Sequence, residues 1–593
     1  MCLVKEDHPA VTPPLSHPPT WVYKRDGRLV PFEADKISRA LFAATESLGR
    51  PDAFLARELT DGVVHFLAAE LDGVIPTTAQ VRDLVIKVVR ELGQPALAEA
   101  FASHVRPSAA AREAARGSET APENVLLVPL VDPPAAFLRV CLREYTLRRV
   151  FARDLVAAQR DGLLTLTGLE APLELAGCVL GQPRTGDGLA EAVIQARRFA
   201  SRFVALDGPE YALAQSSRPG DAAVADHVRG LMLGLRAAGL SAVVNLNCAT
   251  PPPWAGDLAE GPLFAGQKQA PAPAELAVGA DALLEALRQA DPAKGRVRID
   301  WHLAERDFLP EGEARLLRVA RLAAEGDGLA FTFDRPRRPV LLAEGVDRRH
   351  PAVLLTVGLH LPQLAAQPGV AGDTARFLHK LGSLARLALS AAVQKRDFLR
   401  RHGEDRPDVM RGFLLQRARL VAAPVGLEAV ARLFTGRGLC EGKPAVDFTR
   451  QTVQRLREVL RQDGRACLLE TCLDAPPLHF RLDPANPDSI EDVAPGQEGS
   501  AVGEQNFPAE QAANLGAWDT VAEVKAQLRA AGALHAAAET GTAAVFLPTE
   551  PTAEQVADWL RWAWQHTDIA RLRFLRLAPA PQQLTLKIGE GNG

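Results

Sequence analysis

The stretch Trp21-Val-Tyr-Lys-Arg-Asp-Gly-Arg-Leu-Val-Pro-Phe-Glu-Ala-Asp-Lys-Ile37 predicts a β-hairpin that leads directly into a helix. Asp26-Gly27 suits a tight hairpin turn, because glycine adopts positive φ freely and aspartate tolerates it. Val22 before the turn and Val30 after it are strand-forming residues that can face a core. Two short strands and a helix start are therefore compressed into seventeen residues.

Three basic residues lie close to this turn and helix start: Lys24, Arg25 and Lys36. Cations beside helix-terminal N–H groups form a favourable binding site for a polyphosphate. The sequence therefore indicates a phosphate site at the hairpin, and the alternative is that these residues are surface charges on a solvated turn.

The residues from this helix start to about residue 104 predict four helices. Apolar residues repeat at helical spacing after Ile37, after Leu55 and after Val81. Thr77-Thr78-Ala79-Gln80 has the Thr-x-x-Gln form of a capping box, so a helix begins there. Two strands and four helices make a small α+β module that is large enough to fold alone.

Residues 21–106 resemble the ATP-cone, the regulatory nucleotide-binding domain of ribonucleotide reductases and of their bacterial transcriptional repressor. The matching motifs are Val-x-Lys-Arg-Asp-Gly, Phe-x-x-x-Lys-Ile, Ile-Pro-Thr-Thr and Ala-Glu-Ala-Phe. The resemblance implies binding of ATP or dATP with Mg²⁺. It implies that Lys24, Arg25 and Lys36 hold phosphates and that Thr78 lies near the base. The whole implied site is Lys24, Arg25, Asp26, Gly27, Lys36, Thr78 and Arg82, and Arg82 replaces a histidine found in some members.

Composition is typical of a cytoplasmic, bacterial-type protein of several domains. The 593 residues carry a formal net charge of −4, and 47% of them are hydrophobic. This balance gives no general signal for nucleic acid or for a membrane surface. The seven cysteines are scattered without a Cys-x-x-Cys pair, so we expect free thiols, no zinc and no other metal.

Composition shifts divide the chain into a disordered arm (1–20), the cone (21–106), a linker (107–134) and a large domain (135–593). In the last of these, short apolar strands alternate with long helical patterns, which predicts parallel pairing and an α/β sheet or barrel. The predicted strands include 242–247, 296–301, 328–333, 353–360, 466–471, 542–547 and 572–576, and 553–565 is a predicted helix. A Pro-rich break spans 484–511, and Trp301-His302 with Glu305 and Asp307 is interpreted as a strand end followed by a polar turn.

The order of motifs in this domain resembles the catalytic subunit of anaerobic, glycyl-radical ribonucleotide reductase. The motifs are Arg153-Asp-Leu-Val-Ala-Ala-Gln-Arg, Val244-Asn-Leu-Asn-Cys-Ala-Thr-Pro-Pro-Pro-Trp, Thr356-Val-Gly-Leu-His-Leu-Pro-Gln and Pro424-Val-Gly-Leu-Glu. The resemblance implies a ten-stranded α/β barrel around a central finger loop.

Several elements of that family's radical chemistry are missing. The family ends in a four-cysteine zinc site and a radical glycine, whereas no cysteine follows Cys472 here and the glycines of 584–593 belong to a flexible tail. The loop 335–350 lacks the family's thiyl-forming cysteine, and His360 and Gln363 replace its asparagine and arginine. Cys178 and Cys248 match barrel-strand positions but are better explained as buried core thiols.

These differences favour an ATP- or dATP-binding regulatory protein, a non-catalytic homologue of the reductase that forms an oligomer or associates with a reductase subunit. One alternative is an atypical reductase that receives its radical from another subunit and uses Cys178, Cys248 or Cys472. A DNA-binding repressor is a weaker alternative, since neither a zinc ribbon nor a basic stripe occurs.

Overall fold

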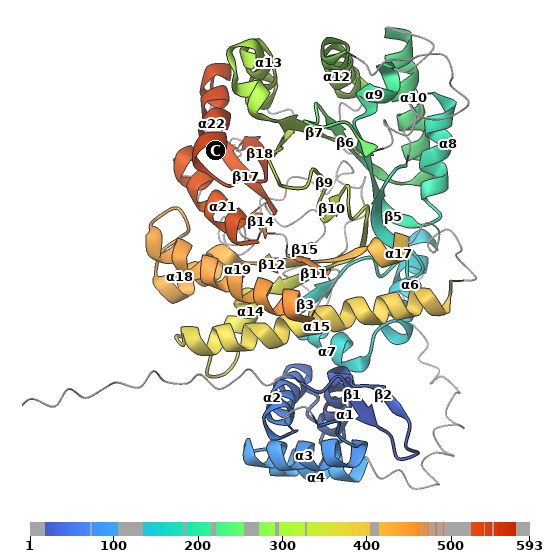
Figure 1. Cartoon of the computed structure of the whole chain (residues 1–593), viewed down its shortest axis with the longest axis vertical. Coiled ribbons are helices and arrows are strands. Elements are labelled where there is room, and N and C mark those ends of the chain that lie inside the picture. The colour runs from blue at the N-terminus through green and yellow to red at the C-terminus, as the bar shows by residue number, and fades with distance from the viewer. Residues whose placement is uncertain are drawn as a thin grey trace, which may run out of the picture. The chain divides into compact units, whose positions relative to one another are not determined.

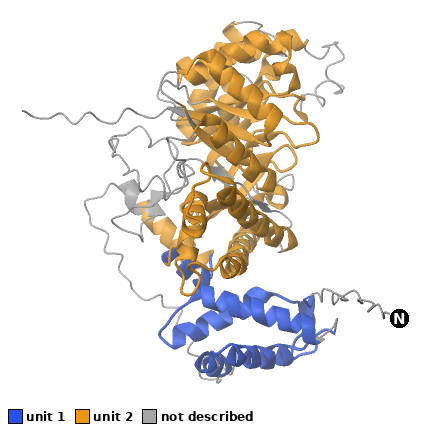
Figure 2. Ribbon diagram, turned by 90° about the vertical axis from the view of Figure 1, so that its left-hand side faces the viewer, with its two compact units in different colours: residues 1–137, 151–160 blue, residues 138–150, 161–593 orange. Residues whose placement is uncertain are grey.

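The computed structural model describes residues 18–71, 74–104, 134–181, 186–214, 221–253, 272–290, 296–325, 329–403, 414–463, 467–469, 471–473, 481–482, 490–491, 523–538, 540–547 and 551–576. Its contacts divide the chain into two compact units, residues 1–137 with 151–160 and residues 138–150 with 161–593 (Figure 2). Nearly all of the predicted arm, linker and Pro-rich break, and the whole predicted tail, lie outside the described residues.

The first unit contains the predicted hairpin and helices. Its elements are β1 (Trp21–Tyr23), β2 (Leu29–Pro31), α1 (Ala34–Ser47), α2 (Ala53–Leu71), α3 (Thr78–Glu91), α4 (Pro95–His104) and α7 (Arg153–Arg160). The strands pair antiparallel with Val22 opposite Val30. The side chain of Val22 is buried, as the alternation in the sequence predicts.

A helical core supports this hairpin. Ile37, Leu41 and Phe42 of α1 are buried, as are Val85 and Val88 of α3. Full burial of such side chains contributes about 1.5–3 kcal/mol each. The short hairpin thus depends on the helices beneath it for its stability.

Helix α7 belongs to this unit, although the sequence assigned it to the large domain. It packs against α1 and α2 and buries Leu155 and Ala158. The residues before it, 138–150, belong to the other unit, so the chain passes from the first unit to the second and back before residue 161. The boundaries at 106/107 and 134/135 stay predictions.

The second unit is an α/β domain built around a large mixed sheet. Its strands are β3 (Leu164–Leu166), β4 (Leu175–Val179), β5 (Ala200–Asp207), β6 (Ser241–Leu246), β7 (Val297–Leu303), β8 (Ala330–Phe333), β9 (Leu341–Ala343), β10 (Val346–Asp347), β11 (Ala352–His360), β12 (Arg419–Val425), β13 (Cys467–Leu469), β14 (Thr471–Leu473), β15 (Arg481–Leu482), β16 (Ile490–Glu491), β17 (Gly541–Leu547) and β18 (Arg571–Arg576). The α/β class is therefore confirmed, and the predicted strands are present within a few residues at their ends.

Helices connect and cover these strands (Figure 1). They are α6 (Pro134–Arg149), α8 (Asp187–Ala196), α9 (Pro209–Ala214), α10 (Asp221–Ala238), α12 (Pro273–Ala290), α13 (Glu313–Ala324), α14 (Leu361–Ala365), α15 (Thr374–Arg401), α17 (Leu414–Arg417), α18 (Leu427–Thr435), α19 (Lys443–Asp463), α21 (Val524–Ala538) and α22 (Ala553–His566), with 3₁₀ turns η1 (Glu305–Phe308) and η2 (Pro310–Gly312). Parallel strands need such crossover connections.

The sheet has twelve strands in the order β13-β12-β11-β4-β5-β6-β7-β8-β18-β17-β14, with β3 paired to β11. Strands β4 to β8 are parallel to one another, and antiparallel pairing occurs where β4 meets β11 and where β8 meets β18. The predicted parallel pairing is thus correct within each half of the sheet except for β3, which pairs antiparallel with β11, and the two halves are joined by antiparallel pairs. Closure of a ten-stranded barrel stays a prediction.

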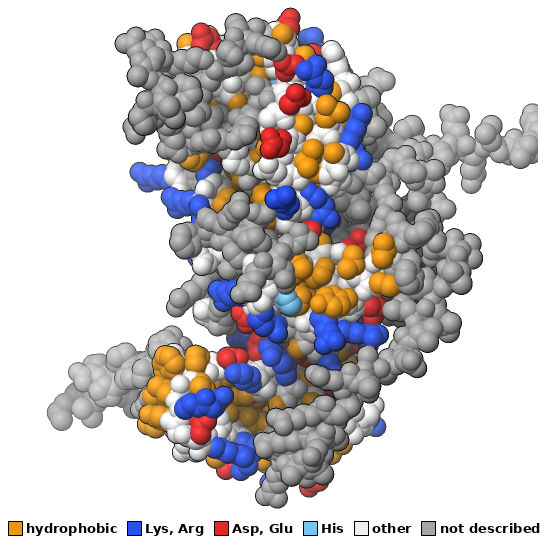
Figure 3. All heavy atoms as spheres, turned by 90° about the vertical axis from the view of Figure 1, so that its right-hand side faces the viewer, with side chains coloured by type: hydrophobic (Ala, Val, Ile, Leu, Met, Phe, Trp, Pro, Cys, Tyr) orange, Lys and Arg blue, Asp and Glu red, His pale blue; other side chains and the backbone are white. Residues whose placement is uncertain are grey.

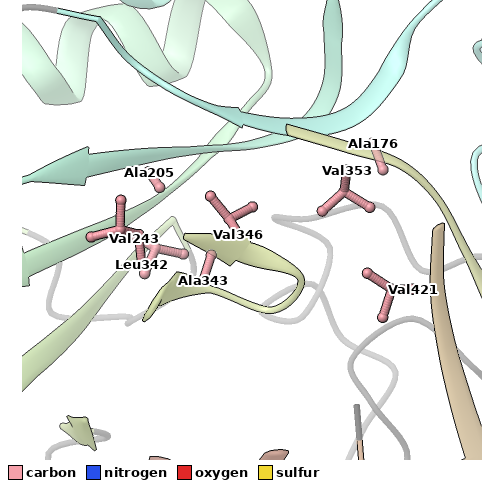
Figure 4. Packing of buried hydrophobic residues seen from close by; sticks show 8 residues of the cluster. All are labelled: Ala176, Ala205, Val243, Leu342, Ala343, Val346, Val353 and Val421. Carbon is pink, nitrogen blue, oxygen red and sulfur yellow. The ribbon is translucent and has the colours of Figure 1, made fainter. Parts of the chain in front are cut away.

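The antiparallel hairpin β9–β10 lies inside this arrangement of strands (Figure 1). Leu342, Ala343 and Val346 of the hairpin are buried against side chains of the surrounding strands (Figure 4). Those partners are Ala176, Ala205, Val243, Val353 and Val421. The predicted loop 335–350 is therefore a packed element whose apolar side chains form part of the core.

Substitution of Gly345, at the turn of this hairpin, tests how closely the hairpin packs against the surrounding strands. Its φ is +73°, and a Cβ atom there would lie 2.2 Å from a methyl carbon of Val421. We expect Gly345→Ala to lower the free energy of unfolding by about 2–4 kcal/mol, from left-handed backbone strain and overpacking together. Urea-induced unfolding measures this loss.

Gly372 provides the matched control, because its φ of +79° is similar but a Cβ there meets nothing within 4 Å. Gly372→Ala should lower the free energy of unfolding by only about 1 kcal/mol. Equal losses in the two variants would contradict the packing described for the hairpin.

Candidate functional site

The turn of the β1–β2 hairpin is built by the residues that the sequence singled out. Gly27 has a φ of +79°, and its N–H donates to the Lys24 carbonyl at 3.0 Å. The Asp26 carboxylate accepts from the backbone N–H of Arg28 at 3.1 Å and from its guanidinium at 2.7 Å. These hydrogen bonds lower the pKa of the exposed Asp26. Asp26 and Gly27 thus shape the turn, and the cations stand beside it.

Strand β1 is tied to the start of α3. The Tyr23 N–H donates to the Pro76 carbonyl at 2.9 Å, and Tyr23 forms a parallel bridge with Thr77. Lys24 follows Tyr23 and Thr78 follows Thr77, so the bridge brings these two predicted site residues to adjoining positions. They are more than fifty residues apart in the sequence.

The capping box predicted for α3 is present. Thr77 Oγ1 accepts from the Gln80 N–H at 3.2 Å, and Gln80 Oε1 accepts from the Thr77 N–H at 2.8 Å. The box satisfies one helix-start N–H group, and the remaining ones near Thr78 stay available to an acceptor. Arg82, in the next turn of α3, donates to Asp83 at 2.7 Å.

The remaining cations differ in how they are held. Lys36 Nζ lies 2.8 Å from Glu33 Oε1 at the start of α1, and both side chains are about half exposed. Lys24 and Arg25 are exposed and have no ion-pair partner among the described residues. Lys24 and Arg25 and the two surface ion pairs Asp26–Arg28 and Glu33–Lys36 therefore lie between the hairpin turn and the start of α1. Exposed cations of this kind attract a polyanion.

A second polar cluster lies at the carboxyl ends of β5 to β8 in the large unit, the edge where α/β sheets bind ligands. Asn245 Nδ2 donates to the carbonyls of Leu206 and Leu342 at 2.9 Å each, which directs its Oδ1 toward His302 Nε2 at 3.0 Å. His302 Nδ1 lies 2.9 Å from the Asp334 carboxylate. Both ring nitrogens of His302 therefore face acceptors, so the ring is doubly protonated.

The pKa values in this cluster agree with that assignment. Burial opposes ionisation of both groups, yet the Asp334 carboxylate raises the pKa of His302 and the imidazolium lowers the pKa of Asp334. Glu210 is buried, and burial raises its pKa to about 7. Its Oε1 accepts from the Asn247 N–H at 3.0 Å. The sequence interpretation of Trp301-His302 as a strand end with a polar turn missed this pair, because Asp334 is distant in the sequence.

The two cysteines proposed from the sequence do not come together. Cys178 lies in β4 and Cys248 follows β6, with β5 between them. Both thiols are buried, which raises the pKa of Cys178 to about 12. Burial, and then the Asp207 carboxylate 3.8 Å from its Sγ, hold the pKa of Cys248 well above its usual value. Neither thiol is poised to ionise.

Ion pairs hold the turn of the β9–β10 hairpin. Arg298 donates to the Glu344 carboxylate at 2.6 Å, and Arg571 lies 3.3 Å from it. Asp300 pairs with the same two guanidinium groups, at 2.8 Å and 3.1 Å. Two cations and two carboxylates thus balance in the interior, which offsets much of the cost of burying them.

His360, Gln363 and Thr167 stand where the resemblance to the reductase implies other residues. Each forms a hydrogen bond within this chain. His360 Nε2 lies 2.7 Å from Thr165 Oγ1, and burial lowers the pKa of His360 to about 4. Gln363 donates to the Asp161 carbonyl at 3.1 Å, and Thr167 donates to the Thr356 carbonyl at 2.9 Å.

Comparison with known proteins identifies the first unit's domain and the second unit's fold. Residues 20–106 match the family described as the ATP cone domain. No curated protein sequence matches the chain. Among solved structures, it is similar to the anaerobic ribonucleotide reductase from Thermotoga maritima in complex with dATP and CTP. The identity is 12%, the TM-score is 0.51, and the match covers 75% of this chain and 83% of that chain.

The same Thermotoga maritima enzyme with glycerol in the active site is also similar. The identity is 14%, the TM-score is 0.51, and the match covers 74% of this chain and 81% of that one. At these identities the likeness shows the fold. The chain therefore carries an ATP-cone, a nucleotide-binding regulatory domain, and an α/β unit with the fold of anaerobic ribonucleotide reductase. No helix among the described residues is long and apolar enough to span a bilayer.

The His302–Asp334 pair predicts a pH dependence of stability. His302 has a raised pKa when folded, so its contribution is full below about pH 6.5 and is lost as pH rises through the higher folded value. Asp334 has a lowered pKa, so its contribution is full above about pH 4 and is lost on further acidification.

The stability lost on His302→Gln should therefore be largest between about pH 4 and 6.5, at about 3 kcal/mol, and should shrink toward pH 9. Urea unfolding of both proteins across this range measures it. His566→Gln, at an exposed position, is the control. A loss in His302→Gln that does not vary with pH would contradict the doubly protonated ring.

Proposed function

We propose that this chain is an ATP- or dATP-binding regulatory protein of the cytoplasm, and that its reductase-like unit does not catalyse ribonucleotide reduction. The observation that carries the nucleotide site is the Tyr23–Thr77 bridge, which joins the basic hairpin to the start of α3. Lys24, Arg25 and Lys36 contact the phosphates, Thr78 and Arg82 lie at the base and ribose, and Asp26 and Gly27 shape the turn.

Binding of the triphosphate rearranges one contact. The Lys36 ammonium leaves Glu33 and turns to a phosphate, a small loss because exposed ion pairs contribute about 0–1 kcal/mol. Mg²⁺ arrives with the nucleotide, held chiefly by phosphate oxygens and water.

Absence of catalysis is proposed from the β9–β10 hairpin. Reduction of a ribose by this family's chemistry needs a thiyl radical on the central loop, and the protein supplies only orientation and electrostatics for it. Residues 335–350 contain no cysteine. Glu344-Gly345 forms the turn instead, and Arg298 and Arg571 neutralise its carboxylate. A fixed ion pair cannot store or pass an unpaired electron.

We also propose that the sheet is a closed barrel of ten strands. The two ends of the strand order, β13 and β14, are consecutive segments of the chain on either side of residue 470. One pairs with β12 and the other with β17. Counted as one strand, they join the two halves into a ring, with β3 as an addition to it. The likeness to the reductase fold supports this interpretation.

We propose that the barrel binds a protein partner, either a second copy of the chain or a ribonucleotide reductase subunit. DNA is a less suitable partner. On the face shown in Figure 3, groups of lysine and arginine side chains are separated by acidic and hydrophobic ones. Nucleic-acid surfaces usually present a continuous basic stripe.

One observation favours the enzymatic alternative, a reductase that receives its radical from another subunit. The residues His302, Asp334 and Asn245 form a polar cluster at the carboxyl ends of the strands, and the Cys248 thiol lies 3.8 Å from Asp207 at the same end of β5. That alternative needs Cys178, Cys248 or Cys472 to carry the radical.

Calorimetric titration of the full chain with ATP and with dATP tests the nucleotide site. We expect a Kd in the micromolar range, about −8 kcal/mol. The double substitution Lys24→Ala and Lys36→Ala should weaken binding at least tenfold, because charge-assisted phosphate contacts are lost. Lys87→Ala removes an exposed lysine paired to Glu70 in the same unit and should leave affinity unchanged. Equal affinity in the double variant and the parent protein would exclude this site.

Anaerobic activation followed by electron paramagnetic resonance tests the second half of the proposal. We expect no protein radical and no deoxynucleotide from ribonucleoside triphosphates, because the hairpin lacks a thiol. A radical signal and turnover that both disappear in Cys248→Ala would support the enzymatic alternative instead. Cys141→Ala, outside the strands of the sheet, is the matched control.

A further inference from the structure

Helix α7 carries a carboxylate into the cone at a position that matters for the nucleotide. Asp154, the second residue of α7, is 2% exposed. Its Oδ1 accepts from the Leu155 N–H at 3.0 Å. Helix α7 packs against α1 and α2. A carboxylate buried in this way needs nearby cations to remain ionised at low cost.

Two arginines supply those cations. Arg57 of α2 is almost fully buried, and its guanidinium lies 2.6 Å from Asp35 and 3.5 Å from Asp61. Arg39 of α1 lies 3.9 Å from Asp35. Burial raises the pKa of Asp154, and the positive charges of Arg39 and Arg57 act against that rise. Asp35 and Asp61 with Arg39 and Arg57 therefore form a network of ion pairs on α1 and α2, the helices against which α7 and its buried Asp154 pack. An added negative charge beside this network would disturb its balance.

This network and the proposed phosphate site share one turn of helix. Asp35 directly precedes Lys36 at the start of α1. A triphosphate bound at Lys36 places several negative charges beside Asp35, and these compete for Arg39 and Arg57. As both guanidinium groups are drawn toward the phosphates, Asp154 loses part of its compensation, and the contact of α7 with the cone weakens.

Helix α7 is followed closely in the chain by the first strand of the large unit. It is joined by three residues to β3, the strand that pairs with β11. Gly162 in that connection has a φ of +68°, a backbone conformation that glycine adopts more readily than other residues. A change in the packing of α7 would therefore act on β3, the first strand of the large unit, through this short connection.

We propose that α7 is the element through which the cone's nucleotide state reaches the rest of the chain, with Asp154 as its charge-sensitive contact on α1 and α2. This inference rests on the proposed nucleotide site and names the element that transmits nucleotide binding to the rest of the chain. Asp154 is a positioning residue: it touches neither the phosphates nor the base.

Hydrogen–deuterium exchange on the full chain, with and without saturating ATP, tests this role. The amides of α7 in the parent protein should exchange about fivefold faster with ATP, the lower end of typical coupling between sites. In Asp154→Asn, which keeps the acceptor for Leu155 and removes the charge, the acceleration should disappear. Because coupling is reciprocal, that variant should also bind ATP up to about fivefold more tightly by calorimetry.

Asp52→Asn is the matched control. Asp52 is exposed and its carboxylate also accepts a helix-start N–H, that of Leu55 at 2.8 Å. This variant should respond to ATP as the parent protein does. A purely structural role for Asp154 would change the unfolding temperature without changing the response of α7 to ATP.

The outcomes separate the two proposals. If calorimetry detects ATP binding but exchange of α7 in the parent protein does not change, the role of α7 is wrong and the nucleotide site stands. The same conclusion follows if Asp154→Asn keeps the full acceleration. If the parent protein binds no ATP, the nucleotide site fails and the role of α7 fails with it. The measurement on the parent protein requires no substitution, so it decides the question even if a variant does not fold.

Discussion

The pairing of Arg298 and Arg571 with the Glu344 carboxylate fixes the centre of the large unit. Charges in an interior cost several kcal/mol each to desolvate, so they are tolerated only where partners of opposite sign meet them at hydrogen-bonding distance. Here Asp300 completes the balance at 2.8 Å and 3.1 Å from the two guanidinium groups. The three partners come from β7 and β18, strands on opposite sides of β8, so the hairpin turn is held from more than one direction. Apolar packing of Leu342, Ala343 and Val346 then fills the space that remains around it.

This anchoring has a chemical consequence for the fold. A loop that carries a radical needs a thiol at its end and a partner that can approach it. A carboxylate held by two arginines offers neither. The polar cluster of Asn245, His302 and Asp334 is nevertheless intact at the strand ends, where α/β sheets commonly hold ligands. The large unit thus combines a polar cluster at the strand ends with a central hairpin whose side chains contribute apolar packing and charge balance.

The first unit works by different means, because its site is assembled from short local elements. The turn between β1 and β2 carries Lys24 and Arg25, the start of α1 carries Lys36, and a capping box sets the start of α3. One parallel bridge between Tyr23 and Thr77 brings these elements together. The ion pair of Arg57 with Asp35 joins α2 to α1, the helix that carries Lys36, and α7 packs against both. The exposed cations of the proposed nucleotide site and the buried ion pairs of Arg57 therefore lie on the same two helices, α1 and α2, or directly beside them.

The sequence by itself determined the local elements: the Asp26-Gly27 turn, the Thr77–Gln80 cap and the strands and helices of the α/β unit, since each depends on the preferences of neighbouring residues. Its motifs also indicated the cone and the reductase-like fold. Only the tertiary structure decided which distant residues meet. His302 meets Asp334, Glu344 meets Arg571, and α7 belongs to the first compact unit rather than the second. None of these pairings leaves a periodic or spacing signal in the chain. The physical reason is that turns and caps are set by short-range backbone hydrogen bonds, whereas buried charges acquire partners only when the sheet brings separate strands together.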